Sequence, residues 1–198
     1  MGLGLLGYVG WQLLGTTWVA QHRAEELVTG LRTGWAAEEP TVVSGSSTAF
    51  AVVRIPRFGA EFQVPLVEGT TPDTLASGGL GRLEGTARPG GRGNLVLAGH
   101  RVTHGEPLRR MPELVPGDRV VIEQADRVDT YVLDTGGADL VVPFTDTWVA
   151  DARPEPPADV AARPSGHPRL LTLVTCAELF HTDDRLVAFG HLVSSTRR

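Results

Sequence analysis

Short apolar runs, separated by glycine and proline, fill most of the chain after residue 47. In residues 49–58 and 61–67 apolar and polar positions alternate around Gly59, which predicts two paired strands. Further runs predict more strands at residues 94–99, 120–123, 128–133, 169–176 and 185–193. Helical signals are few and short, so the pattern predicts an all-β (mainly β) fold, either a barrel or a sandwich.

The N-terminal segment has a different pattern, because no charge interrupts the apolar run from Leu3 to Ala20. Eighteen helical residues rise about 27 Å, close to the hydrocarbon thickness of a bilayer. We therefore expect a single-pass membrane anchor that continues as a helical stalk, together residues 1–33. A cleaved signal peptide is the alternative, but no basic region precedes the run and no small-residue cleavage site follows it.

Residues 34–47 are rich in Glu, Pro, Ser and Gly and predict a linker. The globular domain is then expected to cover residues 48–198. Within it, Thr71 has the features of a helix start, and the proline-rich segment Pro143–Pro168 predicts a long surface loop.

Composition removes several classes of function. The net charge of −5 argues against a nucleic-acid partner. All the basic residues are arginine, so a Walker A phosphate loop and a Schiff-base lysine are both excluded. The one cysteine, Cys176, excludes an internal disulfide and a zinc site built from thiolates.

Cys176 follows a β-rich run and is expected at the rim of the fold, where it is either a buried structural residue or a nucleophile. His100 also ends an apolar strand, and a Cys–His pair is a common means of generating a thiolate. Arg185 begins the next predicted strand after Cys176. If these two strands are antiparallel, the guanidinium returns to the cysteine and can hold an oxyanion.

Metal and cofactor sites are not expected. His100 and His104 have the spacing of a zinc-binding HExxH motif, but Arg101 replaces its glutamate. The glycines between residues 78 and 93 precede a strand, whereas a dinucleotide fingerprint follows one. A cation site at His181, Asp183 and Asp184 is weighed against an ordinary solvated turn, which we favour.

The segments AGHR (98–101), TLVTC (172–176) and DDRLVAFG (183–190) resemble the signature segments of sortases, the membrane-bound cysteine transpeptidases of Gram-positive bacteria. The sequence after His100 is most similar to class E sortases of actinobacteria. The resemblance implies a closed β-barrel of about eight strands, with His100, Cys176 and Arg185 as catalytic residues. It also suggests substrate contacts at Thr175, His104 and Ala177. At the position of His104 the relatives usually carry tyrosine.

The function implied by the resemblance is cleavage of an LPXTG- or LAXTG-like C-terminal sorting signal between Thr and Gly. A thioacyl intermediate on Cys176 then passes the surface protein to an amine of a lipid II-type peptidoglycan precursor. The implied location is the cell membrane, with the catalytic domain outside the cell. The resemblance implies no cofactor. A cysteine peptidase that only hydrolyses the signal, and a non-catalytic β-barrel binding module, are the alternatives.

Overall fold

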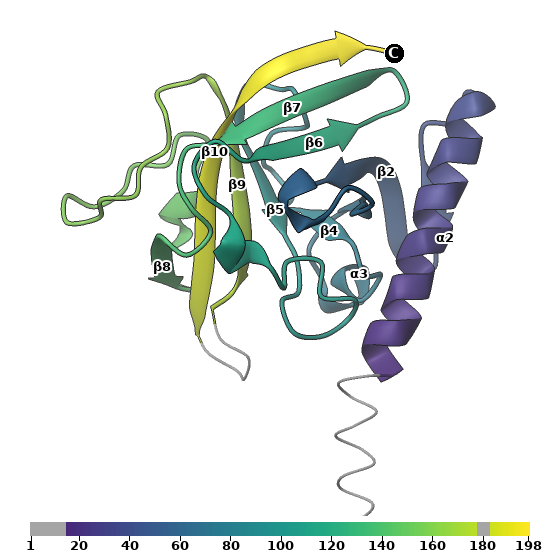
Figure 1. Cartoon of the computed structure of the whole chain (residues 1–198), viewed down its shortest axis with the longest axis horizontal. Coiled ribbons are helices and arrows are strands. Elements are labelled where there is room, and N and C mark those ends of the chain that lie inside the picture. The colour runs from purple at the N-terminus through teal and green to yellow at the C-terminus, as the bar shows by residue number, and fades with distance from the viewer. Residues whose placement is uncertain (1–14, 178–182) are drawn as a thin grey trace, which may run out of the picture.

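Eight strands close into a barrel in the computed structural model, which describes residues 15–177 and 183–198 (Figure 1). Around the barrel the order is β2-β3-β4-β5-β9-β10-β7-β6, and pairing of β2 with β6 closes the ring. The predicted mainly β fold with a closed eight-stranded barrel is therefore confirmed. The strands are β2 (Ser47–Arg54), β3 (Val64–Glu68), β4 (Leu80–Arg82), β5 (Gly93–Ala98), β6 (Arg119–Glu123), β7 (Arg127–Leu133), β9 (Arg169–Cys176) and β10 (Asp184–Arg197).

Two further strands lie outside this ring. β1 (Val42–Ser44) pairs with β2, and β8 (Leu140–Pro143) pairs with the part of β10 that begins at Asp184. β1 lies inside the segment expected to be a linker, and β4 lies inside the glycine-rich segment expected to be a loop. Each is three residues long, so its pairing partner rather than a pattern of its own makes it a strand.

The barrel interior is filled by alternate residues of its strands, as the period of two requires. On β5 Leu95 and Leu97 point inward, and on β9 Leu171 and Leu173 do the same. The residues between them face outward. On the outer side of β8 and β10 a second cluster contains Leu140, Val142, Val149, Val187 and Phe189.

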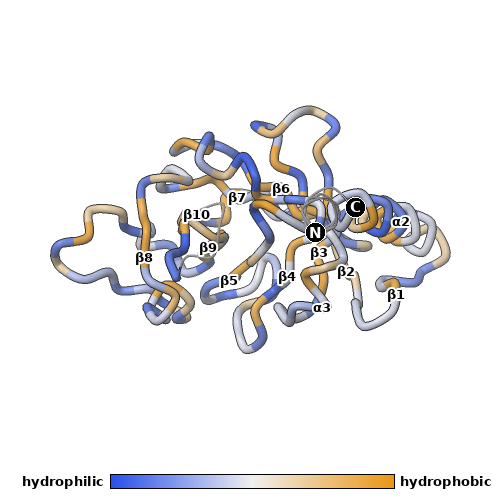
Figure 2. Tube along the Cα trace, turned by 90° about the horizontal axis from the view of Figure 1, so that it is seen from below, coloured by the Kyte–Doolittle hydropathy of each residue, from blue (hydrophilic) through white to orange (hydrophobic). Residues whose placement is uncertain are grey.

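Helix α2 (Thr16–Ala36) packs against the outside of the barrel beside β1 and β2, on the side of the molecule opposite β8 (Figures 1 and 2). Leu27, Val28 and Leu31 are buried against a cluster of strand residues, namely Ala49, Val52 and Val67. Arg32 adds an ion pair with the buried Glu123 of β6 at 3.3 Å. The segment expected to be a stalk is thus part of the packed domain.

The expected single-pass membrane location is corrected by this structure. Along residues 15–177 and 183–198 no helix has both the length and the apolar character needed to cross a membrane. Residues 3–14 of the predicted anchor lie outside the described part of the chain.

The other helical elements within residues 15–177 and 183–198 are short, namely one helix and three 3-10 turns. α3 (Pro72–Leu75) begins where predicted, and the Thr71 hydroxyl accepts a hydrogen bond from the Thr74 amide at 3.3 Å. Three 3-10 turns occupy loops, and one of them lies within the predicted surface loop. They are η2 (Pro56–Phe58), η3 (Met111–Glu113) and η4 (Thr147–Ala150).

Candidate active site

Cys176 and Arg185 face each other across two neighbouring strands. β9 and β10 are antiparallel, and Arg185 is the direct partner of Cys176 in their register. Side chains of directly opposed residues lie on the same face of a sheet. As expected from the sequence, the antiparallel pairing of the two strands therefore brings Arg185 beside Cys176. Both residues are half-buried.

His100 reaches the same place along β5, which runs parallel to β9. Ala98 pairs with Val174, and the Gly99 amide donates to the Val174 carbonyl at 3.2 Å. Continuing this register by two residues brings His100 alongside Cys176. Ala98 and Val174 face out of the barrel, so the two-residue period turns His100 and Cys176 to that face as well.

Thr175 and Ala177 have structural contacts on either side of the cysteine. The Thr175 hydroxyl is buried and donates to the Gly99 carbonyl at 2.8 Å. The Ala177 methyl packs against the barrel core, and its amide donates to the Asp184 carbonyl at 3.0 Å. The substrate contacts expected at these two residues stay predictions.

Arg101 connects the segments that follow the histidine and the cysteine. Its guanidinium donates to the carbonyl oxygen of Ala177, across 76 positions of sequence. In the sequence, Arg101 is notable only as the residue that replaces the glutamate of a zinc motif. The sequence gives one indication of this contact, which is that Arg101 directly follows His100.

The loop after His100 turns back on itself. His104 and Glu106 both have φ of 52°, and Gly105 between them has φ of 84°, so three consecutive residues are left-handed. The turn places the His104 ring against the His100 ring, with centroids 4.8 Å apart and planes inclined by 30°. The Leu108 amide closes the loop by donating to the His100 carbonyl at 3.1 Å.

The two imidazoles share an environment that favours their neutral forms. Burial, and secondarily the charge of His104, lower the pKa of His100 to about 4. Burial also lowers the pKa of His104. At neutral pH His100 is therefore uncharged at rest.

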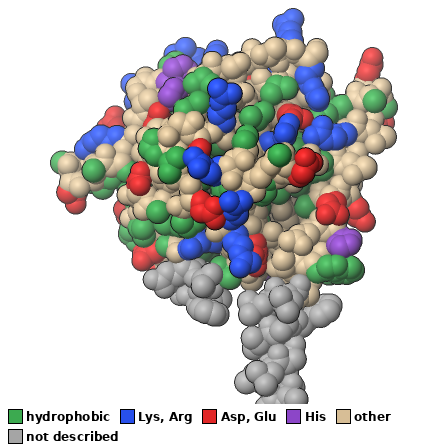
Figure 3. All heavy atoms as spheres, in the orientation of Figure 1, with side chains coloured by type: hydrophobic (Ala, Val, Ile, Leu, Met, Phe, Trp, Pro, Cys, Tyr) green, Lys and Arg blue, Asp and Glu red, His purple; other side chains and the backbone are tan. Residues whose placement is uncertain are grey.

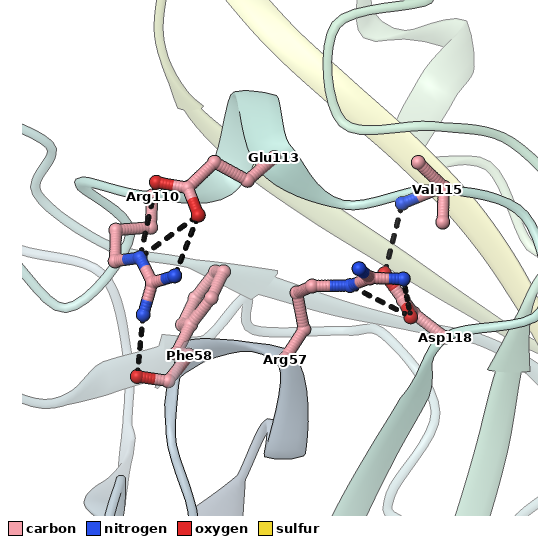
Figure 4. A network of polar contacts seen from close by, with 6 residues as sticks. All are labelled: Arg57, Phe58, Arg110, Glu113, Val115 and Asp118. Carbon is pink, nitrogen blue, oxygen red and sulfur yellow. Dashed lines mark hydrogen bonds and ion pairs between the residues drawn. The ribbon is translucent and has the colours of Figure 1, made fainter.

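A polar network fixes the far end of this loop (Figure 4). Arg110, directly before η3, donates to Glu113 at 2.6 Å and to the Phe58 carbonyl at 2.6 Å. Arg57 of η2 pairs with Asp118 at 2.8 Å, and this bond holds the pKa of Asp118 below its ordinary value. Arg110 thus ties the loop to η2, and Arg57 ties η2 to the turn before β6.

An apolar groove of about 230 Å³ lies beside Arg185, over the outer faces of β5, β8 and β9. The first part of the predicted surface loop Pro143–Pro168 forms one wall. The lining residues are Thr70, Leu83, Val96, Ala98, Val142, Pro143, Phe144, Asp146, Thr147, Val149, Ala150, Val174 and Arg185. The segment Val102–Leu108 is absent from that lining and contributes to a separate hollow of about 200 Å³.

The charged side chains around these elements are mixed in sign. Figure 3 shows arginines and carboxylates interspersed over the visible face.

Over residues 15–177 and 183–198, no group of three or more His, Cys, Asp or Glu side chains is arranged to hold a metal ion. His181, weighed as a cation ligand, lies outside the described residues.

Comparison with known proteins adds independent information. Residues 53–193 match the sortase domain family. Sortase SrtE1 of Streptomyces coelicolor is 30% identical over 204 aligned residues, which cover all of this chain and 55% of that protein. The chain thus spans about half the length of this relative. Sortase D of Bacillus subtilis is 30% identical over 136 residues, covering 60% of this chain and 63% of that protein.

Solved structures agree with the sequence matches. Sortase E from Streptomyces avermitilis superposes with a TM-score of 0.66 and 38% identity, over 75% of this chain and 90% of that one. Sortase E1 from Streptomyces coelicolor, solved with a tripeptide in its active site, gives a TM-score of 0.64 and 31% identity, over 76% and 91%. With the barrel, the domain match and these relatives in agreement, the chain belongs to the sortase family of cysteine transpeptidases, with class E sortases among its relatives.

Proposed function

We propose that this chain cleaves a C-terminal sorting signal of the LPXTG or LAXTG type and transfers the protein to an amine of a peptidoglycan precursor. The observation that carries the proposal is the register of three neighbouring strands. It brings Arg185 opposite Cys176, and it brings His100 alongside Cys176 on the same outer face. A nucleophile, an acid–base group and a permanent cation are the parts that acyl transfer requires.

The chemistry follows from these groups. The Cys176 thiolate attacks the carbonyl carbon of the Thr–Gly bond, and Arg185 donates hydrogen bonds to the oxygen as it gains charge. His100 carries the proton from the thiol to the leaving glycine amine. A second amine then attacks the thioester, gives up a proton to His100, and releases the thiolate.

The groove supports a peptide substrate. Its lining is mainly apolar, and Arg185 lies at the same groove. A bound peptide with apolar residues upstream of the threonine would bury them there and present its Thr–Gly bond to the thiol.

The chain has no lysine, so it offers no side-chain amine to capture its own intermediate.

The experiment measures cleavage and transfer of a fluorogenic LAXTG or LPXTG peptide with and without a glycine-based amine acceptor. Cys176→Ala is expected to abolish both reactions, because the thioester can no longer form. Arg185→Lys is expected to lose most activity, because an ammonium does not reproduce the forked donors of guanidinium. Arg169→Lys, at the opposite end of β9, is the matched control and is expected to retain activity.

The product distinguishes the alternatives. Hydrolysed peptide at saturating acceptor would identify a peptidase instead of a transpeptidase. A chain that neither cleaves nor transfers, and whose Cys176 reacts with iodoacetamide at the same rate with or without His100, would be a binding module.

A further inference from the structure

We infer that helix α2 is a positioning element of the active site, because it supports the left-handed turn that holds His104 against His100. The inference rests on the proposed function for its kinetic readout. Its structural basis is a contact among Ala20 of α2, Gly78 after α3, and Gly105 in the loop after His100.

The first part of this contact joins the helix to Gly78. Ala20 is 1% exposed. A Cβ added at Gly78 would lie 2.4 Å from the Ala20 carbonyl oxygen and 3.3 Å from the Ala20 methyl. No side chain fits between the two backbones, so α2 and the segment that carries Gly78 are in direct contact.

The second part joins Gly78 to the loop. A Cβ added at Gly105 would lie 3.1 Å from the Gly78 Cα and 3.6 Å from the Ala20 methyl. Gly105 is the middle residue of the left-handed turn, with His104 directly before it. The position of Ala20 therefore limits where this turn can lie.

The third part passes from the turn to the candidate acid–base group. His104 is held in a left-handed conformation that a residue other than glycine seldom adopts, so neighbouring contacts must support it. Its ring lies 4.8 Å from the His100 ring. A displaced turn withdraws that ring, and His100 then loses the neighbour that limits its orientation.

The helix is itself firmly seated, as this role requires. Leu27, Val28 and Leu31 are buried against β2 and β3. The buried Glu123 carboxylate pairs with Arg32 of the helix at 3.3 Å and with Arg54 of β2 at 3.3 Å. Arg198 at the end of β10 lies over the Trp35 ring at 5.2 Å. These contacts hold the helix to the barrel.

The test enlarges the side chain at the contact. Ala20→Leu is expected to lower kcat about 10- to 100-fold, the size of effect that a displacement of about 1 Å at a reacting group produces. KM for the sorting peptide is expected to change less than kcat, because Ala20, Gly78 and Gly105 are absent from the groove lining. The ring resonances of His100 and His104 are expected to shift in NMR spectra of the variant.

Gly30→Ala is the matched control. It adds a methyl to the same helix about 15 Å away, where a Cβ would lie 3.3 Å from a Val42 methyl. Wild-type kcat and unmoved histidine resonances are expected. If Ala20→Leu does not fold, Ala20→Gly removes the methyl instead and is expected to give a smaller change of the same kind.

Two results would overturn the inference. One is unchanged kcat and unchanged histidine resonances in a folded Ala20 variant. The other is an equal loss of kcat in Gly30→Ala, which would reduce the role of α2 to general stability. Failure of the proposed function is distinguishable, because the wild type would then transfer no peptide while the Ala20 variant still moved the histidine resonances.

Discussion

The Thr175 hydroxyl donates a hydrogen bond to the carbonyl oxygen of Gly99, and so joins the residue before the cysteine to the residue before the histidine. The bond lies at the end of the parallel β5–β9 ladder and is buried. It reinforces the contact between the two strands at the point where both deliver their candidate catalytic side chains.

Replacing Thr175 by valine tests this bond, because valine keeps the shape and removes the hydroxyl. We expect a loss of about 1 to 3 kcal/mol in the free energy of unfolding, since the Gly99 carbonyl loses its buried partner. We also expect kcat to fall. Denaturant unfolding and peptide kinetics measure both quantities, and Thr175→Ser, which keeps the donor, should recover most of each. Equal kcat in the valine and serine variants would contradict this role.

Arg101 offers a second test of how the two loops are held. Arg101→Ala removes the donor to the Ala177 carbonyl, and we expect kcat to fall about tenfold as the segments beside the histidine and cysteine separate. Arg92→Ala, an exposed change in the turn before β5, is the control and should leave kcat unchanged. If the two variants have the same kcat, Arg101 does not position the site.

His100 should also affect the pH dependence of stability. Its pKa of about 4 in the folded protein lies below the ordinary value of 6.5. Above pH 6.5 the group is neutral in both states and contributes nothing. As the pH falls from about 6.5 to about 4, the unfolded chain takes up a proton that the folded protein does not, so stability falls.

His100→Gln should flatten that part of the curve, because glutamine does not titrate. Urea unfolding of both proteins between pH 4 and 7 provides the measurement. Carboxylates such as Asp118 contribute equally to both, so the difference curve reports His100 together with its coupling to the neighbouring His104. A difference that does not vary with pH would show that His100 titrates normally in the folded protein.

His104 is the candidate reader of the second residue of the sorting signal. His104→Tyr is expected to move preference toward alanine over proline at that position by about 1 to 3 kcal/mol in relative kcat/KM. Because the ring also contacts His100, kcat is expected to change for both peptides, and only their ratio reports on recognition. Matched LAXTG and LPXTG peptides supply the ratio, and an unchanged ratio would mean that His104 does not read the signal.

Sequence patterns predicted the long strands well, because β9 and β10 contain continuous apolar runs, as strands that are buried on both faces do. The sequence did not predict β1, β4 or β8, which have three or four residues and depend on their partners. The packing of α2 was missed for a different reason. Its buried residues Leu27, Val28 and Leu31 directly follow the apolar run Leu3–Ala20, and a run of that length predicts a membrane helix.

The candidate site was predicted in part. The three catalytic candidates came from strand ends and from family resemblance, and their register is consistent with a shared site. The stack of His104 on His100 depends on a left-handed residue that local propensity does not favour. The bond from Arg101 to Ala177 joins segments that only the closed barrel brings together.

The parallel pairing of β5 with β9 has a consequence for the order of folding. His100 and Cys176 are 76 residues apart, and parallel neighbours cannot be joined by a hairpin. The chain pays the entropy of closing that long loop before the two side chains meet. A nascent or unfolded chain therefore carries the Cys176 thiol without the candidate acid–base residue His100 beside it, and the two meet only when the barrel closes.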